Sequence, residues 1–145
     1  MSGIIVGVDG SGHSQRALEW AAREAALRHA PLTVLTVHQA LAGWGGGPVI
    51  YPSDQSDTDY ALKLAQAEAD KALKAIGAQQ PAKVTVRAVN GLAAQELLSA
   101  AEGAEMLVLG SRGAGGFTRL LLGSVSSQVV HHASCPVVVI PADHR

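Results

Sequence analysis

Gly110-Ser111-Arg112-Gly113, separated by nine residues from Gly123-Ser124-Val125-Ser126, is the stretch that decides the fold class. The apolar run Met106–Leu109 just before it is typical of a buried parallel strand. The residues after it, Val125 to Ala133, predict a helix. A glycine-rich segment therefore joins the carboxyl end of a strand to the start of a helix, which is where α/β proteins commonly hold an anion.

The same alternation of strand and helix extends over the rest of the chain. Predicted strands and helices follow one another in the order Ile4–Val8, Ser14–His29, Leu32–Val37, Asp59–Ile76, Val84–Val89, Ala94–Ala101, Glu105–Leu109, Val125–Ala133 and Val137–Ile140. This order predicts an α/β, Rossmann-like fold, an open five-stranded parallel sheet with helices on both faces. We expect residues 1–145 to form a single domain, with Ser14 as the N-cap of the first helix.

Two segments carry further expectations. Residues 40–59, with four glycines and two prolines, follow no period and predict a long surface loop. The last strand, in the segment 136–141, begins and ends with proline, which places it at an edge of the sheet. Because an apolar edge strand tends to pair with another chain, we expect a two-fold homodimer through this strand.

Composition limits the class of protein. The chain has 145 residues, 48% hydrophobic and 16% charged, with a formal net charge of −1. These values favour a globular domain and argue against a nucleic-acid-binding protein. We find no apolar run of membrane-spanning length and no signal-peptide pattern, and the single cysteine, Cys135, excludes an intramolecular disulfide. We therefore expect a cytoplasmic protein that does not contact a membrane.

The glycine-rich segment has the residue types that bind phosphate. Backbone N–H groups of a tight glycine turn can converge on an anion, and Ser124 and Ser126 can add hydroxyl donors. Arg112 would add charge and a planar set of donors. The plainer interpretation is that the glycines serve only the turn and Ser124 caps a helix. Because no G-x4-G-K-[ST] motif is present, hydrolysis by P-loop machinery is not implied.

Asp9 and Val37 end the first two strands, at the same edge of the sheet. The carboxylate of Asp9 could accept from an adenine amino group or a ribose hydroxyl, or help to hold Mg²⁺. The alternative for Asp9 is an Asx turn with the residues that follow it. Val37 could face an adenine ring, or be an ordinary core valine.

The chain resembles the ATP-binding branch of the universal stress protein family over nearly its whole length. The resemblance is carried by Val6-Gly7-Val8-Asp9-Gly10-Ser11, by His132-Ala133-Ser134-Cys135-Pro136-Val137, and by the pattern G-x2-G-x9-G-[ST] over residues 110–124. It implies an adenine nucleotide alpha hydrolase-like fold, a homodimer through the last strand, and ATP bound with Mg²⁺ or Mn²⁺. The nucleotide-binding residues that it implies are Gly7, Val8, Asp9, Val37, Leu109, Gly110, Arg112, Gly113, Gly123, Ser124, Val125 and Ser126.

The function expected from this resemblance is a nucleotide-dependent regulatory module in the response to stress. Bound ATP would change the surface that the protein offers to a protein partner, whose identity the sequence does not give. The alternative is a slow ATPase or an autophosphorylating enzyme, although no general base is evident in the glycine-rich segment. AMP or another adenylyl ligand is a further alternative, because contacts to the adenosine part are the same whatever the number of phosphates.

Overall fold

The computed structural model describes residues 3–9, 12–38, 54–111 and 123–141. In these residues five strands alternate with four helices. The elements are β1 (Ile4–Val8), α1 (Gly12–Arg28), β2 (Leu32–His38), α2 (Asp54–Ile76), β3 (Val84–Asn90), α3 (Ala93–Ala101), β4 (Met106–Gly110), α4 (Ser124–His132) and β5 (Val137–Ile140).

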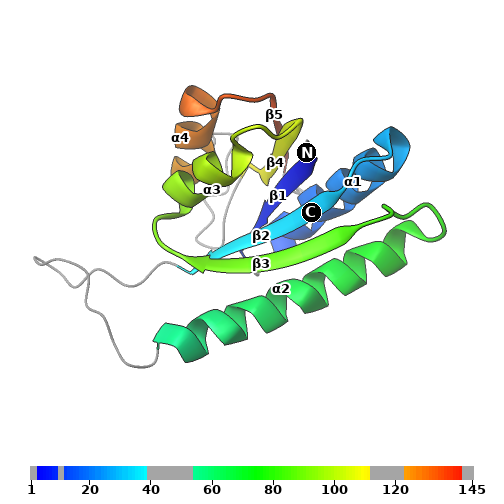
Figure 1. Ribbon diagram of the computed structural model, residues 1–145, viewed down its shortest axis with the longest axis horizontal. Helices are drawn as coiled ribbons and strands as arrows, with labels where there is room; N and C mark the ends of the chain where they lie inside the picture. Colours follow the sequence, from blue (N-terminus) through cyan, green and yellow to red (C-terminus); the bar gives the residue numbers. More distant parts are fainter. Residues whose placement is uncertain (1–2, 10–11, 39–53, 112–122, 142–145) are drawn as a thin grey trace, which may run out of the picture.

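The strands form one sheet in the order β3-β2-β1-β4-β5 (Figure 1). Every neighbouring pair is parallel. The prediction of an open five-stranded parallel sheet is confirmed, and so is the position of β5 at an edge.

Helices cover both faces of the sheet, because alternate residues of each central strand point to opposite sides. Ile4, Val6 and Val8 of β1 pack in one core cluster with α1 and α2. Ile5 of the same strand packs in a second cluster with α3 and α4. Figure 1 shows the two helix layers, with α2 along β3 and with α3 and α4 across the sheet from it. Burial on both faces explains why the central strands are continuous apolar runs.

The start of α2 corrects the predicted loop over residues 40–59. The helix begins at Asp54, so residues 54–59 belong to it, and the rest of the predicted loop lies outside the described residues. The sequence Asp54-Gln55-Ser56-Asp57 has no apolar period, which is why it was predicted as loop. Acidic residues are nevertheless favourable in a first helical turn, where they oppose the positive end of the helix dipole.

Ser14 is not the N-cap of α1, because that helix begins two residues earlier, at Gly12. Its side chain is only 4% exposed. The Ser14 hydroxyl donates to Oε2 of Glu68 on α2, at 3.3 Å, and accepts from the N–H of Asp9 at 3.5 Å. Ser14 therefore links α1 to α2 and to the end of β1.

Candidate functional site

The carboxyl ends of β1 and β4 lie side by side at the point where the strand order reverses direction. Strands β2 and β3 lie on one side of β1, and β4 and β5 lie on the other. In the register of the two strands Val6 of β1 pairs with Val108 of β4, so the next residues of each strand reach the same edge. Val8 and Asp9 thus come close to Leu109 and Gly110. Open α/β sheets bind ligands at this kind of reversal.

The two ends of the glycine-rich segment are held together at this edge. The N–H of Ser111 donates to the carbonyl of Ile140, at 2.9 Å, which continues the pairing of β4 with β5. The N–H of Gly123 donates to the carbonyl of Ser111, at 2.8 Å, so the segment leaves and returns at one place. Arg112 and Gly113 lie outside the described residues.

Gly123 is the N-cap residue of α4. Its backbone is extended, with φ −64° and ψ 167°, and no side chain caps the helix. The first N–H groups of a helix have no partner within the helix, and the positive end of the helix dipole lies there. The start of α4 is therefore suited to an anion.

The three residues after Gly123 have different environments. Ser124 is exposed, whereas Val125 packs against the core cluster of α3 and α4. Ser126 is buried, and its hydroxyl donates to the carbonyl of Gly110 at 2.8 Å. Ser126 thereby fixes the first turn of α4 to the end of β4, and Ser124 is the hydroxyl of the pair that faces solvent.

Gly7 is the next-to-last residue of β1, close to this edge of the sheet. A Cβ built on Gly7 would lie 2.9 Å from Cδ2 of Leu109 and 2.9 Å from Cδ2 of Leu97 on α3. Because real Cβ atoms essentially never come so close to other atoms, a side chain at Gly7 would require the ends of Leu97 and Leu109 to shift within the packed core. This requirement is separate from the nucleotide contact that the sequence predicts.

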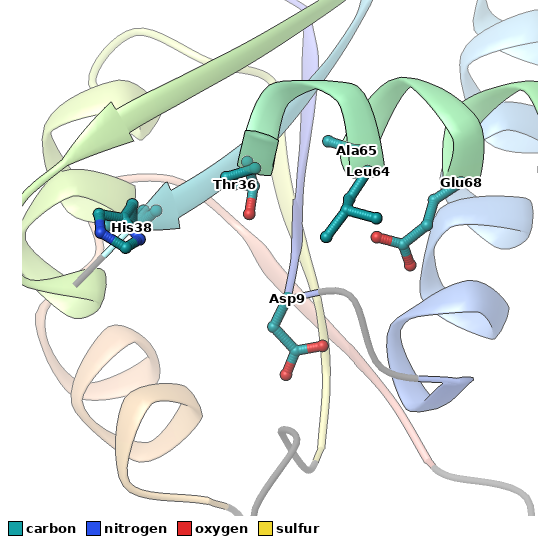
Figure 2. Close-up of a pocket in the computed structure, with 8 residues that line it drawn as sticks. Asp9, Thr36, His38, Leu64, Ala65 and Glu68 are labelled. Carbon is teal, nitrogen blue, oxygen red and sulfur yellow. The ribbon is translucent and has the colours of Figure 1, made fainter. Parts of the chain in front are cut away.

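A cavity of about 170 Å³ opens beside the site, between the ends of β1 and β2 and the first half of α2 (Figure 2). It brings together two predicted site residues, Asp9 and Val37. The other lining residues were not predicted, and they are Thr36, His38, Ala61, Leu64, Ala65 and Glu68. The four residues of α2 could not be predicted as part of a ligand site, because their amphipathic pattern is that of any helix packed on a sheet.

Two of the four polar side chains that line the cavity, Asp9 and Glu68, are acidic, and the other two are Thr36 and His38. Both residues reach the same space, and Figure 2 shows Glu68 beside Leu64 on α2 and Asp9 below them at the end of β1. Two carboxylates in one cavity repel a polyanion.

Within the described ranges no group of three or more His, Cys, Asp or Glu side chains could hold a metal ion. Among the same residues, no helix is long and apolar enough to cross a membrane. The cytoplasmic location stays a prediction.

Comparison with known families decides the assignment. The family model described as the universal stress protein family matches residues 1–141. The chain belongs to the universal stress protein family. Among curated relatives, it is 40% identical over 144 residues to universal stress protein Rv2005c of Mycobacterium tuberculosis, covering 97% of this chain and 48% of that protein. It is 36% identical over 147 residues to a universal stress protein of Mycolicibacterium smegmatis, covering 99% and 49%. The chain thus spans about half the length of these curated relatives.

Solved universal stress proteins share the fold. A universal stress protein crystallised in complex with cAMP is 25% identical, with a TM-score of 0.68 over 98% of both chains. The universal stress protein of Archaeoglobus fulgidus in complex with dAMP is 27% identical, with a TM-score of 0.67 over 97% of this chain and 98% of that one. UspA of Lactobacillus plantarum is 26% identical, with a TM-score of 0.72 over 96% and 97%. Two of these similar structures thus hold adenine nucleotides.

Proposed function

We propose that this universal stress protein binds an adenine nucleotide, ATP among them, and acts as a nucleotide-dependent regulatory module of a stress response. The observation that carries the proposal is the junction of β4 with α4. There the glycine-rich segment starts and ends at one point, and the uncapped first turn of α4 lies beside the ends of β1 and β4. Two similar universal stress proteins, bound to cAMP and dAMP, support an adenine nucleotide as the ligand class.

The charges favour one orientation of the nucleotide. The cavity beside β2 has two carboxylates, Asp9 and Glu68, so it suits a neutral base better than a phosphate. The start of α4, with Gly123 and the exposed Ser124, suits the phosphates. We therefore place the base next to Asp9 and Val37, and the phosphates at Gly110, Gly123 and the first turn of α4. The predicted contacts of Arg112 and Gly113 belong to the same phosphate region.

The residues fit Mg²⁺ or Mn²⁺ only as a companion of the phosphates. Within the described residues no cluster of three ligating side chains exists, and Asp9 is the one carboxylate that the sequence places at the nucleotide. Mg²⁺ is commonly held by one or two carboxylates together with substrate phosphates and water. When bound, the ion would neutralise phosphate charge. With Asp9 next to the base, the chain's own part would be the donors at the start of α4, which hold the phosphates that bind the ion.

A homodimer through β5 belongs to the same proposal, with residues 1–145 as one universal stress protein domain and with a protein partner of unknown identity. β5 is an edge strand of four apolar residues, each only partly buried. Val137, Val138 and Ile140 pack against the two core clusters, whereas Val139 belongs to neither. An apolar edge of this kind is suited to pairing with a second copy.

Calorimetric titration of the purified chain with ATP, AMP and adenosine, with and without Mg²⁺, tests the proposal. Gly123→Val is the decisive variant, because φ −64° and ψ 167° are open to valine and the backbone is not strained. We expect it to remove the extra affinity of ATP over adenosine. Gln128→Val, at an exposed position later in α4, is the matched control and should bind like the parent.

The outcomes separate the parts of the proposal. Failure of the parent protein to bind any of the three ligands would refute adenine nucleotide binding. Unchanged ATP affinity in Gly123→Val would refute the placement of the phosphates. Formation of ADP during the titration would support the alternative of a slow ATPase.

A further inference from the structure

Three arginines lie along α1, and one of them has a different kind of partner. Arg23 and Arg28 each pair with a glutamate one turn earlier in the helix, at 3.9 Å and 2.6 Å. Arg16 instead donates from Nη1 to the carbonyl oxygen of Pro141, at 2.9 Å. In the ranges that the structure describes, Arg16 is exposed and forms no ion pair with a carboxylate. Its positive charge is therefore available to an anion from solvent.

The bond to Pro141 places the guanidinium of Arg16 at the carboxyl edge of the sheet. Pro141 directly follows Ile140, the last residue of β5. The carbonyl of Ile140 accepts from the N–H of Ser111, and the carbonyl of Ser111 accepts from the N–H of Gly123, at 2.9 Å and 2.8 Å. The guanidinium is thus held next to the residues that join the end of β5 to the junction of β4 with α4.

The order of the strands sets where each part of a nucleotide would lie along this edge. The base is placed above at the ends of β2 and β1, and the first phosphate at the end of β4 and the start of α4. The next strand in the order β3-β2-β1-β4-β5 is β5. Further phosphates would therefore extend towards the end of β5, where Arg16 reaches the edge. Because α1 packs on the face of the sheet opposite α4, Arg16 would approach them from the other layer (Figure 1).

Resting on the proposed function, we propose that Arg16 binds the second and third phosphates of the nucleotide and makes this chain prefer a nucleoside di- or triphosphate to a monophosphate. A guanidinium has five N–H donors in a planar fork, and Pro141 occupies one of them. The remaining donors can hold phosphate oxygens in pairs. The preference follows from charge, because each added phosphate brings more negative charge to the cation.

The bond from Arg16 to Pro141 also fastens the end of β5 to α1, and this structural role has a different signature. Loss of a fastening at the sheet edge would weaken the binding of adenosine, AMP and ATP alike. Loss of a contact to the outer phosphates weakens ATP and leaves adenosine and AMP nearly unchanged. The ratio of ATP to AMP affinity therefore separates the two roles.

Arg16→Gln is the test, and Arg23→Gln is its matched control. Both substitutions remove one positive charge from α1, but Arg23 lies later in the helix and pairs with Glu19. Adenosine, AMP and ATP are titrated calorimetrically into the parent and both variants, in one low-salt buffer with Mg²⁺. We expect Arg16→Gln to lower ATP affinity about five- to tenfold, and the affinity of AMP and adenosine less than about twofold. Arg23→Gln should keep the parent affinities.

A second variant keeps the test independent of the bond to Pro141. Arg16→Lys retains a charge and a donor but not the planar fork, so it should recover part of the ATP affinity that Arg16→Gln loses. Should Arg16→Gln not melt cooperatively, the ATP to AMP ratio of Arg16→Lys against the parent takes its place, and a lower ratio is expected.

The outcomes separate this inference from the proposed function. An ATP to AMP ratio in Arg16→Gln equal to that of Arg23→Gln would overturn the role of Arg16. Equal losses for adenosine, AMP and ATP would overturn it as well, because the bond to Pro141 would then be structural only. If the parent binds none of the three ligands, the proposed function fails. If the parent binds them and only the ratio stays unchanged in Arg16→Gln, the proposed function stands and this inference fails.

Discussion

Replacing Ser126 by alanine should loosen the junction between β4 and α4 and lower the stability of the whole domain. Ser126 is 6% exposed, and its hydroxyl donates to the carbonyl of Gly110 at 2.8 Å. The substitution removes this hydrogen bond and leaves the carbonyl of Gly110 with one partner fewer. Because Gly110 is the last residue of β4, the lost contact lies where the glycine-rich segment begins.

The magnitude follows from the burial of the bond. A net hydrogen bond contributes about 1 kcal/mol, and leaving a buried partner unsatisfied raises the cost to about 1–3 kcal/mol. Alanine forms helices better than serine, which offsets up to about 0.5 kcal/mol. For a domain of this size about 1 kcal/mol corresponds to a shift of roughly 3–5 °C in the melting temperature. We therefore expect a loss of about 1–2 kcal/mol and a lower melting temperature.

Urea denaturation followed by circular dichroism measures the loss. Ser127→Ala is the matched control, because Ser127 is the next residue of the same helix and, unlike Ser126, is only partly buried. It gains the same helix propensity and leaves the bond from Ser126 to Gly110 intact. The difference in unfolding free energy between the two variants then isolates the bond to Gly110. Equal midpoints for the two variants would refute the argument that Ser126 fastens α4 to β4.

The other predictions concern separate parts of the domain. Gly7→Ala should lower the free energy of unfolding by about 1–3 kcal/mol, because the new methyl group meets Leu97 and Leu109 at 2.9 Å; an unchanged urea midpoint would contradict the packing argument. Val139→Lys should give monomers in light scattering, since it places a charge on the β5 edge without entering either core cluster; a persistent dimer would place the interface elsewhere. Burial raises the pKa of the Cys135 thiol, and a backbone hydrogen bond from Leu107 lowers it by less. The reactive thiolate therefore forms only at higher pH, and iodoacetamide should modify Cys135 more slowly at pH 8 than it modifies the same residue in the urea-unfolded chain.

The strands could be predicted from the sequence almost to the residue. β1 and β5 run over the predicted residues, and β2 and β3 each extend one residue further. Apolar β-branched runs bounded by turn residues define a buried strand locally, so no long-range information is needed. The first turn of α2 could not be predicted in the same way, because a polar helical turn that begins at Asp54 has no apolar period to mark it.

The candidate site could be predicted in part. The ends of β1, β2 and β4 follow from the alternation of strand and helix, and the structure brings Asp9 and Val37 to one cavity. The contribution of Glu68 could not be predicted, because it depends on how α2 packs across the sheet. Thr36 did have a signal, as a polar residue at a position that alternation places on the buried face with Val34. Gly7 could be predicted as a site residue only ambiguously, because a sequence does not distinguish a glycine needed for packing from one that lies against a ligand.

Because the site lies between two helix layers, different nucleotides should stabilise different helices. The cavity is bounded by α2, in the layer of α1 and α2, whereas the uncapped helix start belongs to α4, in the other layer. A ligand with a base at one end and phosphates at the other would be bivalent, holding both layers from the sheet edge. Adenosine alone would protect amide protons of α2 from hydrogen exchange and leave α4 unprotected. Each added phosphate would extend that protection to α4. The number of phosphates on the nucleotide would thus determine how rigid α4 becomes.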